Sequence, residues 1–265
     1  MKIAISGKGG VGKSTLAGLL ALTFVEAGNK VLAIDADPDA NLGSALGFTR
    51  KEINSITPLS EMKEFISERT GIKGPSLGQM FKLNPQVDDI PARFSLKKGD
   101  LNLLLLGTFE KGGSGCFCPE NSLLRSLISH VLRLKDEVVI VDMEAGLEHL
   151  GRGTASFVDA FVVVVEPSQN SLQTALKIKE LASDIGVNES FLVANKIKGN
   201  SDLEFIKKNT PGFALLGTIS YSLELIEGDL RGDSPYVSSP DTYNQVKIIK
   251  EQLEKLIPER HPGSK

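Results

Sequence analysis

The glycine-rich segment at residues 7–14 constrains the fold of this chain more than any other feature. It reads Gly-Lys-Gly-Gly-Val-Gly-Lys-Ser and matches G-x-x-x-x-G-K-[ST], a pattern whose glycines let successive backbone N–H groups turn toward phosphate oxygens. An apolar run at 2–6 precedes it and a helical pattern follows it, as a strand–loop–helix phosphate site requires. In isolation the segment could be a flexible turn. With these flanks it predicts a nucleoside triphosphate site.

Each position of this phosphate loop has an expected role. Lys13 reaches the terminal phosphates, and the Ser14 hydroxyl contacts a bound Mg²⁺. Lys8 is a second lysine in the loop, and an ammonium this close to Lys13 is electrostatically costly unless it points elsewhere or is simply solvated. The residues expected to hold the nucleotide phosphates are Gly9, Gly10, Val11, Gly12, Lys13, Ser14 and Thr15.

The composition of the chain argues against several classes of protein. Its 265 residues are 41% hydrophobic and 24% charged with a formal net charge of −3, which is ordinary for a globular protein. No basic stripe of the kind that binds nucleic acid is present, and no apolar run approaches the roughly 20 residues that span a bilayer. The apolar start is broken at once by the loop, unlike a secretory signal. We therefore expect a cytoplasmic protein with no nucleic-acid or membrane partner.

Apolar segments alternate with helical ones along most of the chain. Runs such as 138–141 and 161–165 are continuously apolar, which is typical of strands buried on both faces of a parallel sheet. The sequence therefore predicts an α/β fold, a doubly wound and mostly parallel β-sheet flanked by helices. The expected strands are 2–6, 30–35, 101–106, 138–142, 160–165, 190–194 and 213–219, and the expected helices are 14–27, 120–134, 169–185, 201–209 and 241–257.

The segment from about 50 to 100 interrupts this alternation. It is rich in proline and glycine, with one helical piece near 58–69, so we expect an insertion that covers one edge of the site. We expect a single domain over 1–258, followed by a disordered tail at 259–265.

Two of the expected strands end in carboxylates. Asp35 and Asp37 lie at the end of the second strand, and Asp142 ends the fourth. Carboxylates at the carboxyl ends of strands beside a phosphate loop can hold Mg²⁺ through water or orient an attacking water, and Asp142 fits the first role. Asp37 also has a structural alternative, since it could cap a short helix that begins at Pro38.

Two further polar segments follow core strands. The segment 143–153 is rich in glycine and polar groups and fits a loop that senses the terminal phosphate, although it could be an ordinary connector. His149 within it could couple nucleotide state to a metal site or simply be a satisfied loop histidine. Asn195 and Lys196 end another strand, and an asparagine amide matches the N6/N7 edge of adenine. We expect these two residues to bind the base; an asparagine that closes a turn is the alternative.

Both cysteines of the chain lie in one tripeptide. Cys116 and Cys118 stand in a glycine-rich segment just before an expected helix. Two thiolates can bind one soft or borderline metal ion without completing its coordination, and a homodimer axis here would supply four, tetrahedral for Zn²⁺ or square planar for Ni²⁺. A strained disulfide, two buried structural cysteines and a redox pair are the alternatives, and each fits the spacing or the flanks less well.

The phosphate loop resembles the deviant Walker A motif, K-G-G-x-G-K-[ST], of the MinD/ParA/nitrogenase iron protein group of P-loop ATPases. The resemblance implies that the nucleotide is ATP or ADP and that Lys8 reaches across a homodimer interface to the phosphates of the other subunit. It also implies that Asp37 positions the hydrolytic water and that Asp35 supports the Mg²⁺ shell. The expected catalytic residues are Lys8, Lys13 and Asp37, and the expected Mg²⁺ site is Ser14, Asp35 and Asp142.

A narrower resemblance adds the segment D-M-E-A-G-x-E-H at 142–149 and the C-x-C pair. These features, over residues 2 to about 220, resemble the CooC family of nickel-binding ATPases that assist maturation of carbon monoxide dehydrogenase. The resemblance implies an ATP-dependent nickel metallochaperone that dimerises around ATP and a Ni²⁺ or Zn²⁺ ion. Its partner would be apo carbon monoxide dehydrogenase or the related acetyl-CoA synthase.

Two other functions remain open on the sequence. A MinD/ParA-type positioning ATPase would use the same switch on a membrane or DNA, but it predicts a basic amphipathic C-terminal helix, and 246–257 mixes both charges evenly. An iron–sulfur reductase like the nitrogenase iron protein would carry its cluster cysteines on two separate elements, whereas here they share one tripeptide.

Overall fold

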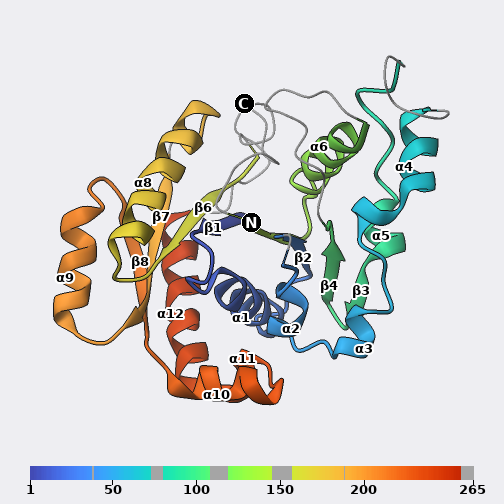
Figure 1. Ribbon diagram of the computed structural model, residues 1–265. Coiled ribbons are helices and arrows are strands. Elements are labelled where there is room, and N and C mark those ends of the chain that lie inside the picture. Colours follow the sequence, from blue (N-terminus) through green and yellow to red (C-terminus); the bar gives the residue numbers. More distant parts are fainter. Residues whose placement is uncertain (38, 73–79, 108–118, 145–156, 188, 258–265) are drawn as a thin grey trace.

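The computed structural model describes residues 1–37, 39–72, 80–107, 119–144, 157–187 and 189–257. Within these residues, eight strands form one central sheet with helices on both faces (Figure 1). The strand order is β3-β4-β2-β5-β1-β6-β7-β8, and every adjacent pair is parallel except β3 with β4. The predicted α/β fold, a mostly parallel sheet flanked by helices, is confirmed.

The strands lie where the apolar runs predict them. β1 lies between β5 and β6, and β5 lies between β1 and β2. In the register of these strands, Asp142 of β5 is opposite Ile5 of β1 on one side and Asp35 of β2 on the other. The carboxyl ends of β1, β2 and β5 therefore meet at one edge of the sheet, where the phosphate loop leaves β1. The strands are β1 (Lys2–Gly7), β2 (Val31–Ala36), β3 (Leu96–Lys98), β4 (Leu101–Leu105), β5 (Val138–Met143), β6 (Ala160–Val165), β7 (Ser190–Ile197) and β8 (Ala214–Ser220).

Helices bury the two faces of the sheet in separate apolar clusters. One cluster joins α1 and α12 to the face that presents Ile3 and Ile5, and the other joins α6 and α8 to the face that presents Ala4. Strand residues alternate between the clusters, which explains why the strands are apolar throughout. The helices are α1 (Lys13–Glu26), α2 (Leu42–Ala45), α3 (Arg50–Ile53), the 3₁₀ helix η1 (Leu59–Glu61), α4 (Lys63–Thr70), α5 (Ile90–Phe94), α6 (Pro119–Val131), α8 (Gln169–Asp184), α9 (Asn200–Asn209), α10 (Leu223–Arg231), α11 (Pro235–Ser238) and α12 (Pro240–Leu256).

Three elements of consequence escaped the sequence analysis. β3 is a short edge strand whose two lysines are exposed, and its one strand partner is β4, with which it pairs antiparallel. α10 is an exposed amphipathic helix that contains Gly228, and α11 has four residues. Such elements form through contacts with the rest of the fold rather than through strong local propensity, so pattern reading misses them.

The segment between α2 and β4 adds a lobe at the β3 edge of the sheet (Figure 1). Its helical piece near 58–69 is present as η1 and α4. Ile66, Val87 and Ile90 belong to the same apolar cluster as α6, so the lobe packs into the core of the protein.

Among the described helices, none combines the length and the apolar character that crossing a membrane requires.

Candidate nucleotide-binding site

The phosphate loop requires glycine at two positions for steric reasons. Gly7 has a φ of +152°, and a Cβ there would collide with the Val164 carbonyl of the neighbouring strand β6. Gly12 has a φ of +97°, and a Cβ there would collide with the Asn195 amide. Both conformations are rare for residues with side chains. The loop thus passes close to β6 and to the end of β7, and its shape depends on both.

The two loop lysines have different surroundings. Lys13 is only 5% exposed, and its Nζ lies 3.3 Å from Oδ2 of Asp37. Lys8 is partly exposed, and within the described residues its side chain makes no ion pair or hydrogen bond. Lys13 is therefore committed to this site, whereas Lys8 is available to a group outside it.

Asp142 is the feature that best fits a magnesium ion. The residue is fully buried, and among the described residues neither carboxylate oxygen has a hydrogen-bond partner of normal geometry. Burial raises the pKa of Asp142 to about 6, and Asp37 adds to the rise, whereas the Ser14 hydroxyl and the Lys13 ammonium oppose it. A buried carboxylate without a partner is costly, and a hydrated cation beside Ser14 would satisfy it.

The protein alone does not make a complete cation cage here. Within the described residues, no three His, Cys, Asp or Glu side chains are grouped closely enough to hold a metal ion. Mg²⁺ is commonly held by one or two carboxylates together with substrate phosphates and water, so this donor set fits Mg²⁺ bound with a nucleotide.

Asp35 organises the chain that follows β2. Its carboxylate accepts hydrogen bonds from the backbone N–H groups of Asp37 at 3.2 Å and Leu42 at 2.9 Å. Burial, and then the neighbouring Asp142, raises the pKa of Asp35 to about 7. Since both Asp35 oxygens are used by the backbone, its support of the Mg²⁺ shell would be indirect.

The structural alternative for Asp37, capping a helix that begins at Pro38, is wrong. Residues 39–41 are not helical, and the next helix, α2, begins at Leu42. The Asp37 carboxylate accepts the Asp39 N–H at 3.1 Å in a turn, and its other oxygen faces Lys13. The side chain is therefore held at the phosphate loop, next to the group that would meet the phosphates.

Asn195 and Lys196 touch the phosphate loop itself. The Asn195 amide nitrogen donates to the Val11 carbonyl at 2.7 Å, and the Lys196 ammonium donates to the Gly10 carbonyl at 2.7 Å. Their predicted contact with adenine stays a prediction, but the geometry gives them a second role that the sequence did not suggest.

The loop opens into a cavity of about 590 Å³. Residues of the phosphate loop and Asp37 line one side of it. The other side was missed by the sequence analysis and comes from β8, α10, α11 and their connections, with Tyr221, Leu225, Ile226, Asp229, Asp233 and Pro235. One signal was available, because Ser222 caps α10 by accepting the Leu225 N–H at 3.2 Å, and a serine before a helical stretch is a standard start signal.

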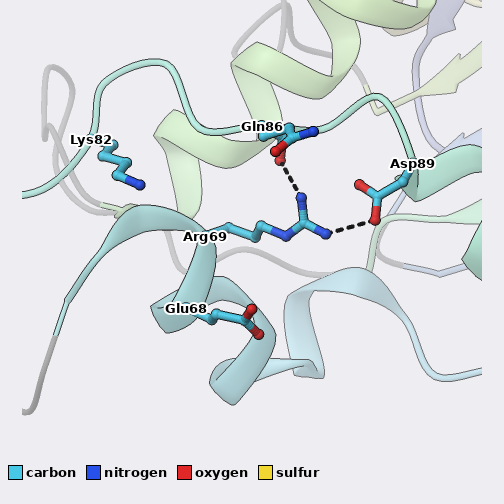
Figure 2. A pocket seen from close by; sticks show the side chains of 5 residues that line it. All are labelled: Glu68, Arg69, Lys82, Gln86 and Asp89. Carbon is cyan, nitrogen blue, oxygen red and sulfur yellow. Dashed lines mark hydrogen bonds and ion pairs between the residues drawn. The ribbon is translucent and has the colours of Figure 1, made fainter.

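A second pocket, of about 450 Å³, lies in the α4 lobe (Figure 2). Arg69 crosses it to an ion pair with Asp89 at 2.6 Å and to the Gln86 carbonyl at 3.3 Å, while Glu68 and Lys82 line its rim. No residue of the phosphate loop lines this pocket. Asp89 also pairs with Arg93 at 2.8 Å, so these contacts tie α4 to the start of α5 and fix the lobe.

Four sequence predictions lie outside the described residues. These are the thiol pair Cys116 and Cys118, His149, the predicted disordered tail at 259–265, and the part of the phosphate-sensing segment at 145–153. Its first two residues are described: Met143 is buried in β5, and the Glu144 carbonyl accepts the Ser6 hydroxyl at 2.8 Å. The start of that segment is thus tied to β1, directly before the phosphate loop.

Comparison with known proteins agrees with this geometry. Residues 2–236 match the family described as the CobQ/CobB/MinD/ParA nucleotide-binding domain. The carbon monoxide dehydrogenase accessory protein CooC of Rhodospirillum rubrum is 47% identical over 91% of this chain and 91% of its own length. An ATP-binding protein of Methanocaldococcus jannaschii is 44% identical over 88% of this chain and 90% of its own. The MinD cell division protein of Aquifex aeolicus shares the fold with a TM-score of 0.65 and 20% identity, over 96% of this chain and 97% of that one.

The fold and the phosphate site define the class, that of P-loop nucleotide-binding proteins of the MinD/ParA type. The chain belongs to the CobQ/CobB/MinD/ParA nucleotide-binding family and, within it, to the CooC family.

Proposed function

We propose that this protein is an ATP-dependent nickel metallochaperone that matures carbon monoxide dehydrogenase or acetyl-CoA synthase. The observation that carries the proposal is the 47% identity to a carbon monoxide dehydrogenase accessory protein over nearly the whole chain. The unsatisfied Asp142 carboxylate beside Lys13 and Ser14 supports the ATP-dependent part. We expect it to act in the cytoplasm, where thiols stay reduced.

In this proposal the phosphate loop binds Mg²⁺·ATP. Ser14 and Asp142 would hold Mg²⁺, with Asp35 behind them, and the ion would neutralise charge on the phosphates. Lys13 would exchange its contact with Asp37 for the terminal phosphate. That exchange releases the Asp37 carboxylate, which can then orient an attacking water. Hydrolysis would be slow, and its role would be to switch the protein between two states rather than to turn over ATP rapidly.

Lys8 would act in trans. Its side chain makes no ion pair within the described residues, although it stands next to a site built for a polyanion. A second subunit facing the loop would bring its own Lys8 to the phosphates, so ATP would draw two copies together. Dimerisation would then depend on nucleotide, as a switch requires.

The metal cargo would be held by Cys116 and Cys118 of both subunits. This segment joins β4 to α6, and α6 packs on the same face of the sheet as α8. Four thiolates across a dimer axis suit Ni²⁺ or Zn²⁺. Opening or closing of the dimer would change the number of thiolates on the ion and thereby release it to the apo-enzyme.

A positioning ATPase of the MinD/ParA type is the second candidate, since the fold is shared with MinD. Its C-terminal helix would need a basic face for a membrane. Two of the three lysines of α12 are paired with acids instead, Lys247 with Glu26 at 2.8 Å and Lys250 with Glu254 at 2.7 Å.

Activation of a client enzyme tests the proposed function. Nickel-loaded protein with Mg²⁺·ATP is mixed with apo carbon monoxide dehydrogenase, and carbon monoxide oxidation is followed. We expect activation by the native chain, little with Lys8→Ala, and none beyond free nickel with Cys116→Ser/Cys118→Ser. Equal activation by all three proteins would rule out the metallochaperone and favour the positioning ATPase.

A further inference from the structure

Two consecutive carbonyl groups of the phosphate loop are held by side chains from the end of β7. The Gly10 carbonyl accepts the Lys196 ammonium, and the Val11 carbonyl accepts the Asn195 amide, both at 2.7 Å. A trans peptide is planar, so the C=O of one residue and the N–H of the next point in opposite directions. Each of these contacts therefore aims the following N–H away from β7, and the first of them, the Val11 N–H, meets the Lys8 carbonyl at 3.4 Å inside the loop.

The next carbonyl is held in a similar way by the helix. The Gly12 carbonyl accepts the Leu16 N–H at 3.0 Å, which fixes the direction of the Lys13 N–H. Three successive peptide planes, from Gly10 to Lys13, are thus set by partners behind them. N–H groups that point the same way from a turn form the concavity that binds anions.

The backbone at Lys196 adopts an unusual conformation that directs its side chain toward the phosphate loop. Its φ is +59°, a left-handed conformation that is uncommon for a lysine. The pairing of β7 with β8 shifts register between Ala194 and Ile197, so Asn195 and Lys196 occupy an irregularity in the ladder. Bulges of this kind re-aim side chains, and such strain persists only when surrounding contacts hold it.

Glu166 holds the lysine from the other side. Its Oε2 lies 2.7 Å from the Lys196 ammonium, and it follows β6, the strand between β1 and β7. The Lys196 side chain is 41% exposed, so without a partner it would sample many rotamers. The carboxylate restricts it to the one that reaches Gly10. Glu166 is in turn placed just before α8, and its N–H donates to the Ser171 hydroxyl at 3.1 Å.

We propose that Glu166 and Lys196 are positioning residues that shape the phosphate loop, Glu166 acting through Lys196 and Lys196 through the Gly10 carbonyl. The inference rests on the ATP binding of the proposed function and adds Glu166 to its machinery. It assigns the pair to the phosphate groups of the ligand, not to the base.

Binding of two probes tests the assignment. Calorimetry measures Mg²⁺·ATP and inorganic tripolyphosphate, which has no base. We expect Lys196→Ala to weaken both by about tenfold, as for loss of a hydrogen bond from a charged donor. Glu166→Ala should weaken both by about threefold, and should add almost nothing in the Lys196→Ala background. Lys196→Arg, which keeps a donor, should bind nearly as the native chain does.

Lys247→Ala is the matched control. Lys247 has the same 41% exposure and is also paired with a glutamate, Glu26 at 2.8 Å, but it lies on α12. The melting temperature of Lys247→Ala and its affinities for Mg²⁺·ATP and tripolyphosphate give the effect of losing a surface ion pair alone. Loss of ATP affinity with unchanged tripolyphosphate affinity in Lys196→Ala would overturn the inference, since the lysine would then contact the base. Unchanged affinity for both probes would also overturn it. Neither probe involves nickel, so failure of metal delivery would leave this inference standing.

Discussion

The two sides of the nucleotide cavity are built in different ways. The phosphate side consists of backbone held from behind by β7 and α1, with Lys13 and Asp142 buried beside it. The opposite side, which we propose meets the base and call the base side, is formed by α10 and its neighbours, where the apolar side chain of Ile226 remains 47% exposed. Rigid backbone suits a ligand group that is the same in every nucleotide. A surface built from side chains suits contacts that change as the site opens and closes.

The largest effect is expected from Gly12→Ala on the phosphate side. The new Cβ would meet the Asn195 amide in a left-handed backbone, so the loop must move and ATP affinity should fall more than about 100-fold. Calorimetry measures the affinity. Gly28→Ala is the control, because Gly28 also has a positive φ, +83°, but open space around it. It should cost about 1 kcal/mol of stability and leave ATP affinity unchanged. Equal losses of affinity would contradict the steric argument.

A second test separates chemistry from binding within the phosphate side. Asp37→Asn should lower kcat for ATP hydrolysis by about 100-fold, the lower range for loss of a residue that handles the attacking water. KM should change little, because Lys13 leaves Asp37 for the phosphates in the complex. Steady-state phosphate release measures both, with the exposed neighbour Asp39→Asn as a comparison expected to lose much less. A higher KM with normal kcat would mean that Asp37 only holds Lys13.

The buried carboxylates of the phosphate side should make the free energy of unfolding depend on pH, and we expect no such contribution from the base side. Asp35 and Asp142 have raised pKa values, about 7 and about 6, so the folded chain binds more protons than the unfolded chain between about pH 4 and 7. Stability of the metal- and nucleotide-free protein should therefore fall as pH rises through that window, by up to about 7 kcal/mol if both shifts count in full. Urea unfolding at several pH values measures it. Asp142→Asn should flatten the slope, and Glu254→Gln on α12 should not; a native stability that rises over this window would contradict the burial argument.

The smallest effect should come from the base side. Leu225→Ala trims a half-buried side chain that lines the cavity and should weaken ATP by about three- to fivefold, with tripolyphosphate unchanged. Leu230→Ala on the same helix is the control, since Leu230 is 83% exposed and does not line the cavity. If Leu225→Ala weakened tripolyphosphate equally, the division between the two sides would be wrong.

The sequence predicted the two sides unequally, and the reasons are physical. The glycine spacing of the phosphate loop and the carboxylate near the end of β5 are local patterns, and both lie where the patterns put them. Six of the seven predicted strands were readable because they are largely buried on both faces, whereas β8, at the edge of the sheet, is only partly buried. α10 and β3 are short and exposed, so their existence depends on contacts far along the chain.

The contacts by which Asn195, Lys196 and Glu166 hold the phosphate loop could not be predicted from the sequence. They depend on a positive φ at Lys196 and on a register shift between β7 and β8, neither of which has a residue signature here. Glu166 lies 30 residues from Lys196 and meets it only because β6 and β7 are neighbours in the sheet. Such pairs are properties of the fold rather than of a motif.

Metal stoichiometry and particle mass, measured together with and without ATP, test the central claim most directly. Size exclusion with light scattering and elemental analysis are applied to nickel-loaded native chain and to Cys116→Ala/Cys118→Ala. The account predicts one nickel per two native chains in an ATP-promoted dimer, and no bound nickel in the double variant. A monomer that carries a full nickel complement, or a double variant that retains it, would contradict the account.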